Sequence, residues 1–262
     1  MGNISKTYID YNVRPAMFVK EDCSKTGFDF HSLLYHTAPL VGKFSINQPL
    51  TITGTKARFE LVPDLDFDVT IENSKLFGAN MAAIHNHSAK LMLSKELPYM
   101  DNKIMPDADS WKELNISAGE LSIREIIMKF SKYVPIKTLP LHRDFRLHNI
   151  MFGADYYHLI DFDFAAYDDV SMEVMGMVVD LLEHGFEYVE AFLRAYMESS
   201  NIDTYDYMAS NYLIYLASSC FPYDRIDTLE PEAFDILANE RTSRLIRLYL
   251  NMDNIAKFFQ DK

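Results

Sequence analysis

One segment near the middle of the chain, residues 139–164, constrains the fold more than any other part of the sequence. A polar stretch at residues 142–148 is followed by a short apolar run that begins after position 149 and ends at Gly153-Ala154-Asp155. A second apolar run, residues 156–160, then leads to another acidic residue. Two short apolar runs around a Gly-containing turn predict a β-hairpin, which brings the outer ends of its two strands together.

Three oxygen-bearing side chains flank this predicted hairpin. Asn149 precedes its first strand, Asp161 follows its second strand, and Asp144 lies on the polar stretch just before it. Two carboxylates and one amide oxygen at one place suit Mg²⁺, which binds a few carboxylates together with phosphate oxygens and water. The segment therefore predicts a Mg²⁺ site that also binds phosphate oxygens.

Two other interpretations use the same segment. The first is a structural hairpin whose acidic residues only face solvent. The second is a zinc site, but the candidate histidines have no standard zinc spacing and no cysteine lies near them. These candidates are His142, His148 and His158.

The order of residues in this segment resembles a known arrangement. The pattern H-x-D-x-x-x-x-N, followed by an apolar strand that ends in Ile-Asp, is similar to the catalytic and metal-binding loops of the kinase fold. The run HRDF at residues 142–145 and the run LIDFD at residues 159–163 resemble the aminoglycoside phosphotransferase and choline kinase group more than protein kinases.

The resemblance implies a role for each polar residue of the segment. Asp144 would be the catalytic base, and His142 would pack under the catalytic loop and fix its shape. Asn149 and Asp161 would hold Mg²⁺, with help from Asp163 through water. The phosphate donor would be ATP or GTP.

The first part of the chain supplies the expected nucleotide site by the same resemblance. Gly2 and Ser5 lie where the family has a phosphate-covering loop, which works through backbone N–H groups. Lys20, at the end of an apolar strand, stands where the kinase fold carries its phosphate-binding lysine. Glu60 and Val62 resemble the hinge that meets the adenine ring. The carboxylate partner of Lys20 stays open, with Asp29 as the best candidate and His31 near the usual place of a glutamate.

The remaining pattern predicts an α+β, two-lobed, protein-kinase-like fold. Residues 1–63 read as a reduced β-rich N-lobe, with strands at 6–10 and 16–20 and a hairpin over 50–62. Residues 64–262 read as a larger helical C-lobe that contains the catalytic hairpin 139–164 and the acceptor site. The expected helices are 28–36, a helix from 74, 117–133, 171–182, 186–198, 206–218 and 231–259.

Charge and composition exclude some functions. The formal net charge of −13 disfavours nucleic-acid binding, which needs clustered Lys and Arg, and is compatible with a cationic small-molecule acceptor. No apolar stretch is long enough to span a bilayer, so we expect no membrane association. Cys23 and Cys220 lie far apart without metal-type spacing, which indicates reduced thiols in a cytoplasmic protein.

We therefore expect an aminoglycoside-phosphotransferase-like enzyme that transfers a nucleotide γ-phosphate to a small-molecule hydroxyl. A choline, ethanolamine or sugar kinase of the same fold is the alternative acceptor class. A nucleotide-binding pseudokinase is the alternative from another class, because the expected phosphate loop has only one glycine.

Glu173 would brace the catalytic loop or simply begin a helix, and the oligomeric state stays open. Acceptor-pocket candidates, each also explained as a surface acid or core aromatic, are Asp168, Asp169, Glu183, Glu187, Tyr188, Tyr223 and Asp224.

Overall fold

The computed structural model describes most of the chain in two compact units. One unit comprises Met1–Tyr99 and Lys137–Ile202, and the other comprises Met100–Ile136 and Asp203–Lys262. Gly2, Ser5, Asp29 and His31 lie outside the described residues, and the predicted boundary at residue 63 stays a prediction. The described residues are 6–10, 17–21, 34, 37–47, 49–53, 56–62, 67–91, 117–118, 121–122, 136–153, 155–202, 205, 207–219 and 231–260.

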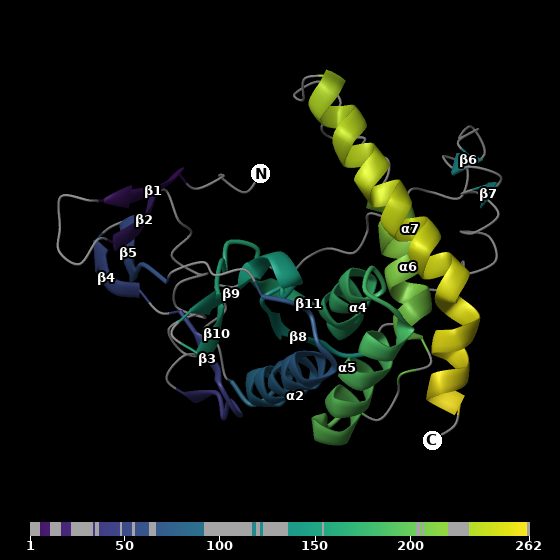
Figure 1. Cartoon of the computed structure of the whole chain (residues 1–262), viewed down its shortest axis with the longest axis horizontal. Helices are drawn as coiled ribbons and strands as arrows, with labels where there is room; N and C mark the ends of the chain where they lie inside the picture. The colour runs from purple at the N-terminus through teal and green to yellow at the C-terminus, as the bar shows by residue number, and fades with distance from the viewer. Residues whose placement is uncertain are drawn as a thin grey trace. The chain divides into compact units, whose positions relative to one another are not determined.

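A four-stranded antiparallel sheet forms the first part of the first unit, in the order β1-β2-β5-β4 (Figure 1). Val19, Ala57 and Phe59 are buried on it, and Phe59 packs against Phe18 with ring centroids 6.1 Å apart. The predicted strands and the predicted hairpin of this region are confirmed. Their bounds are β1 Lys6–Asp10, β2 Met17–Glu21, β4 Pro49–Thr53 and β5 Lys56–Glu60.

The hairpin predicted within residues 139–164 is also confirmed. Strand β9, Ile150–Gly153, pairs antiparallel with β10, Tyr156–Leu159, and Leu159 lies opposite Ile150. On its other side β10 pairs in parallel with β3, Phe44–Ile46, a strand that the sequence pattern did not indicate. Three residues are too few to show a period of two, so only the paired structure reveals this strand.

A second strand pair lies on either side of the hairpin in sequence. Strand β8, Thr138–Leu141, pairs antiparallel with β11, Ala166–Asp169, so that Leu139 lies opposite Asp168. The polar stretch that follows β8 is therefore framed by two short sheets.

Two helices of the first unit, α2 and α4, begin at side-chain caps. Helix α2, Ile71–Ser88, starts with a capping box in which the Thr70 side chain and the Asn73 side chain each bond the other's backbone N–H. Helix α4, Val170–Leu181, is buried along its whole length, and the Asp169 side chain caps it.

Helices α2 and α5, Phe186–Ser199, lie side by side (Figure 1). Their close approach depends on Gly78 of α2, because a Cβ atom there would lie 2.2 Å from the carbonyl oxygen of Phe192. The glycine therefore sets the distance between these two helices.

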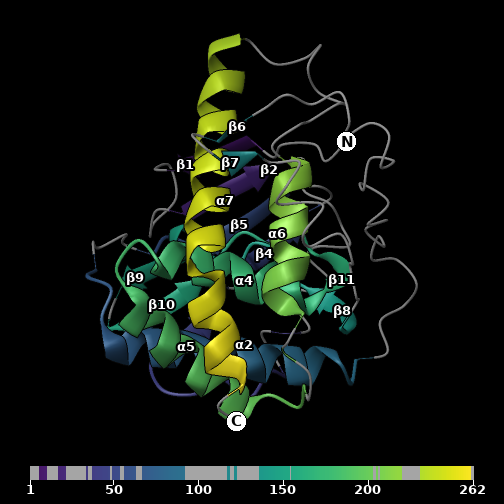
Figure 2. The ribbon, with the colours of Figure 1, turned by 90° about the vertical axis from the view of Figure 1, so that its right-hand side faces the viewer.

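The described residues of the second unit form two paired strands and two helices. Helix α6, Met208–Ser219, packs along helix α7, Pro231–Gln260 (Figure 2), and Tyr205 stacks on Phe259 with ring centroids 5.8 Å apart. The helix predicted over 117–133 is wrong at its start, where β6, Ser117–Ala118, and β7, Leu121–Ser122, form a small hairpin. None of the described helices carries an apolar stretch that would reach across a bilayer.

Candidate active site

The hairpin brings Asn149, Asp144 and Asp161 to one place. The backbone N–H of Ile160 donates to the Asn149 carbonyl at 3.0 Å, which puts Asp161 beside the start of β9. The Asn149 side-chain Nδ2 donates to both the backbone oxygen of Asp144, at 2.9 Å, and its carboxylate Oδ2, at 2.8 Å. Both partners can only accept, so the orientation of the amide is determined. Among the described residues, nothing donates to Asn149 Oδ1, which is therefore available to a cation.

His142 shapes the loop between β8 and the hairpin. It is fully buried, and its ring lies 4.2 Å from that of Phe162. Its Nε2 donates to the Ile160 carbonyl at 2.7 Å, while its Nδ1 accepts the backbone N–H of Asp144 at 3.1 Å. A carbonyl only accepts and an amide N–H only donates, so the ring is in its neutral Nε2–H form. This arrangement makes His142 a positioning residue that ties the loop to the hairpin.

Asp144 carries the ionisable group at the centre of the cluster. His148 Nε2 donates to Asp144 Oδ2 at 3.3 Å, on the same oxygen that Asn149 contacts. Burial raises the pKa of the Asp144 carboxyl, but the hydrogen bond and charge of His148, with weaker help from nearby basic side chains, outweigh burial and lower that pKa. The carboxyl is therefore ionised at neutral pH.

Lys20 joins the cluster from strand β2. Its ammonium group is almost completely buried and contacts Asp161 Oδ1 at 2.6 Å and Asp163 Oδ2 at 2.8 Å. Asp161 adopts a φ of 62°, a left-handed conformation that is uncommon for residues other than glycine. The two carboxylates predicted for the metal are thus gathered around one cation. Asp29, the predicted partner of Lys20, lies outside the described residues and stays a prediction.

The predicted hinge lies near the end of the hairpin. Asn47 donates its backbone N–H to Leu159 of β10 at 3.0 Å. Its side-chain Nδ2 lies 3.5 Å from the Glu60 carbonyl, at the outer limit for a hydrogen bond. Val62, two residues further, is buried. Glu60 is therefore held close to β10, which ends two residues before Asp161, although no described contact joins Glu60 to Asp144.

Asp180, which the sequence reading did not single out, anchors the other end of the loop. Its carboxylate binds Arg146 through two hydrogen bonds, one of them from Nε at 2.8 Å, and also accepts the backbone N–H of Leu147 at 3.1 Å. Asp180 lies 34 residues away from Arg146 on the buried helix α4, so no local pattern could have indicated this pairing.

Glu173 does not brace the catalytic loop, contrary to one of the two interpretations. Its Oε2 lies 3.0 Å from Nε2 of His85, whose Nδ1 lies 2.8 Å from the Tyr196 hydroxyl. All three side chains are buried, and together they join helices α4, α2 and α5. Glu173 is therefore part of the core that supports the site.

Two acceptor-pocket candidates also have other roles. Asp168 is buried and accepts Arg143 Nε at 2.8 Å. Asp169 is buried as well, and its Oδ1 accepts the backbone N–H of Ser171 at 2.8 Å. Because both carboxylates are buried and engaged, the expectation that they line an acceptor pocket is wrong.

The donor set fits Mg²⁺ as a site completed by a substrate. Among the described residues, no group of three His, Cys, Asp or Glu side chains is arranged to hold a metal by itself. Mg²⁺ is commonly held by one or two carboxylates plus substrate phosphates and water. The amide oxygen of Asn149, which accepts from no described residue, and the carboxylate of Asp161 match that incomplete set.

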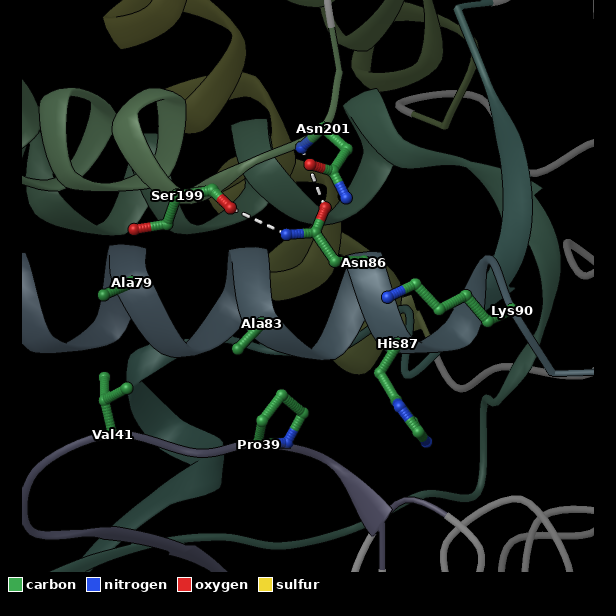
Figure 3. A pocket seen from close by; sticks show the side chains of 9 residues that line it. All are labelled: Pro39, Val41, Ala79, Ala83, Asn86, His87, Lys90, Ser199 and Asn201. Carbon is green, nitrogen blue, oxygen red and sulfur yellow. Dashed lines mark hydrogen bonds between the residues drawn. The ribbon is translucent and has the colours of Figure 1, made fainter.

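A separate pocket of about 250 Å³ lies on helix α2, away from this cluster. In Figure 3, Asn86 of α2 donates to the Ser199 carbonyl at 2.7 Å and accepts the backbone N–H of Asn201 at 2.8 Å. Val41 lines the opposite side of the same pocket. None of the residues predicted for phosphoryl transfer lines this pocket. The hydrogen bonds of Asn86 hold the end of α5 against α2.

Comparisons with known proteins bear on the fold and the family of the chain. A search of curated protein sequences returned no match. Among solved structures, spectinomycin phosphotransferase APH(9)-Ia in complex with ADP and spectinomycin is 13% identical, with a TM-score of 0.65, and the match covers 94% of this chain and 88% of that one. The choline kinase LicA from Streptococcus pneumoniae is 12% identical, with a TM-score of 0.63 and coverage of 94% and 92%. A microcompartment-associated aminopropanol kinase is 13% identical, with a TM-score of 0.62 and coverage of 97% and 91%.

These likenesses confirm the predicted α+β, protein-kinase-like fold. The sequence itself matches the model of the phosphotransferase enzyme family over residues 64–209, which is more than half of the chain. That segment contains the loop, the catalytic hairpin and the buried helix described above. The chain therefore belongs to the phosphotransferase enzyme family.

Proposed function

We propose that this phosphotransferase is a Mg²⁺-dependent small-molecule kinase that transfers the γ-phosphate of ATP or GTP to an alcohol group. One observation carries the proposal. Asn149 holds the Asp144 carboxylate through its amide nitrogen, and its amide oxygen accepts from no described residue. Its backbone carbonyl accepts the N–H of Ile160, the residue directly before Asp161. A carboxylate base and a set of oxygen ligands thus lie side by side, as phosphoryl transfer requires.

Asp144 orients the acceptor hydroxyl and accepts its proton. Its Oδ2 is held by Asn149 and His148, while no described residue donates a hydrogen bond to its Oδ1. The lowered pKa keeps the carboxylate ionised, so that it is ready to accept a hydrogen bond from the acceptor. The hydroxyl oxygen then attacks the γ-phosphorus in line, and the bond from that phosphorus to the nucleoside diphosphate breaks.

Asn149, Asp161 and Asp163 would hold the metal ion. Bound there, Mg²⁺ would offset negative charge on the phosphates of the donor. Lys20, whose ammonium group already contacts Asp161 and Asp163, would provide a further positive charge near the same phosphates. Gly2 and Ser5, and the hinge residues Glu60 and Val62, stay predictions for nucleotide binding.

The nature of the acceptor is a finer proposal. We infer an amine-bearing alcohol of the aminoglycoside type, with choline, ethanolamine or a sugar as alternatives. The formal net charge of −13 supports a cationic acceptor, and the similar structures include a spectinomycin phosphotransferase and a choline kinase. A cytoplasmic location and the absence of nucleic-acid partners stay predictions from composition.

The test measures ADP release from Mg-ATP and GDP release from Mg-GTP with pooled acceptors. The pools contain aminoglycosides, choline with ethanolamine, sugars and amino alcohols. Asp144→Asn should abolish release while nucleotide affinity is retained, and Asp161→Asn should weaken Mg-nucleotide binding itself. Asp155→Asn is the matched control, because Asp155 lies on the turn of the same hairpin, is highly exposed and has a left-handed φ that Asn tolerates.

Each outcome separates the candidates. Acceptor-dependent release by the wild type and by Asp155→Asn, but not by Asp144→Asn, supports the proposal and names the acceptor class. Equal release by Asp144→Asn would remove Asp144 as the base. No release and no nucleotide binding would overturn the kinase proposal and favour a pseudokinase that acts as a scaffold.

A further inference from the structure

The residue directly before the proposed base has an unusual backbone. Arg143 adopts a φ of 67°, a left-handed conformation that an L-residue with a long side chain rarely occupies. Such a conformation persists only when surrounding contacts hold it. Here the visible contact is an ion pair, in which Arg143 Nε donates to Asp168 Oδ2 at 2.8 Å.

The partner in this ion pair is itself rigidly placed. Asp168 lies in strand β11, opposite Leu139 of β8, and only 1% of it is exposed. Its second oxygen, Oδ1, accepts the backbone N–H of Asp169 at 2.8 Å. The carboxylate is therefore fixed by the strand pair and by its own backbone before it meets the arginine.

The catalytic loop is held by three anchors on three different elements. His142 binds the Ile160 carbonyl, Arg143 binds Asp168, and Arg146 with Leu147 binds Asp180. The Arg143 anchor acts on the residue directly before Asp144. The φ and ψ angles of Arg143 set the direction of the peptide bond that leads to Asp144. A shift at this point moves the Asp144 carboxylate directly.

We propose that the Arg143–Asp168 ion pair is a positioning device that holds the loop in its left-handed turn and thereby aims Asp144 at the acceptor hydroxyl. Arg143 and Asp168 act through Asp144 and contact neither substrate. This inference rests on the proposed function of Asp144. Its consequence is that loss of the ion pair lowers the rate of the chemical step without weakening nucleotide binding.

A double-mutant cycle on the full chain tests this role. Arg143→Gly removes the ion pair. Glycine adopts a positive φ without strain, so the substitution frees the turn from its anchor without creating a steric clash. Asp168→Asn keeps the size of the side chain and removes its charge. Arg194→Ala is the control, because Arg194 forms an exposed ion pair with Glu190 at 2.6 Å in the same unit.

Both single variants should lose about tenfold or more in kcat, because small misplacement of a catalytic group is costly, while the KM for nucleotide stays within about twofold. The double variant should lose about as much as either single variant, since the two residues act as one unit. Arg143→Lys should recover part of the rate. A purely structural ion pair would instead lower thermal stability and leave kcat per folded molecule unchanged, which would overturn the inference.

Hydrogen exchange provides a readout that does not depend on turnover. In Arg143→Gly, the backbone N–H of Asp144, which His142 Nδ1 accepts at 3.1 Å, should exchange at least about tenfold faster as the loop loosens. Unchanged exchange would overturn the inference even if the enzyme is active. Absence of turnover in the wild type would overturn the proposed function, whereas the exchange rates would still decide whether the ion pair orders the loop.

Discussion

Replacement of Asp180 should be the most damaging single change near the site. Its carboxylate neutralises the nearly buried guanidinium of Arg146 and caps the backbone N–H of Leu147. Asp180→Ala would leave that positive charge inside the protein without its partner. The loop that carries Asp144 would at the same time lose its anchor on helix α4.

The expected cost follows from these contacts. Removal of one partner from a buried ion pair typically costs about 3–5 kcal/mol. The lost hydrogen bond to Leu147 adds about 1 kcal/mol. Because a domain of this kind is commonly stable by about 5–15 kcal/mol, the variant should still fold but with a much smaller free energy of unfolding.

Urea unfolding, followed by circular dichroism, measures this free energy for the wild type and the variant. The control is Glu72→Ala, because Glu72 forms an exposed ion pair with Lys75 at 2.8 Å and should change stability by less than about 1 kcal/mol. A loss no larger for Asp180→Ala than for this control would refute the reasoning.

A second variant separates stability from loop position. Arg146→Met combined with Asp180→Leu removes both charges and fills the space with apolar side chains, so much of the lost stability should return. Acceptor-dependent turnover should nevertheless stay low, because the Leu147 N–H still lacks its anchor. Full recovery of turnover in this double variant would show that the anchor does not position the loop.

Three further results are expected. Gly78→Ala should destabilise the protein by about 1–3 kcal/mol in thermal or urea unfolding, because its Cβ would lie 2.2 Å from the Phe192 carbonyl oxygen, although helix propensity alone predicts stabilisation by about 1 kcal/mol. Tyr196→Phe should cost about 1–3 kcal/mol in urea unfolding, because it leaves buried His85 Nδ1 without its partner. The folded-state pKa of Asp144 lies below 3.8, so its ionised form contributes stability above that pH and loses it as the pH falls through the folded-state pKa. Wild-type stability should therefore fall more steeply than that of Asp144→Asn below about pH 4, and parallel curves in acid unfolding would contradict this.

Much of the local structure was predictable because it is encoded in neighbouring residues. The apolar runs around Gly153 indicated the hairpin, and the predicted helical segments match α4, α5, α6 and α7 to within one or two residues. The region over 117–133 was misread as a helix from its start, where the structure has the short strands β6 and β7. Strands of two residues are too short to show a periodic pattern.

The residue order over 142–163 was enough to predict the kinase-like segment, because Asn149 and Asp161 flank one hairpin and Asp144 lies just before it. The distant residues that hold this segment in place became apparent only from the folded arrangement of the elements. Lys20 meets Asp161 across 141 positions, and Arg146 meets Asp180 across 34. A local sequence pattern shows the periodicity of one strand or helix. The partner of a charged side chain depends instead on how whole elements pack, and this packing can bring together residues at any separation in the sequence.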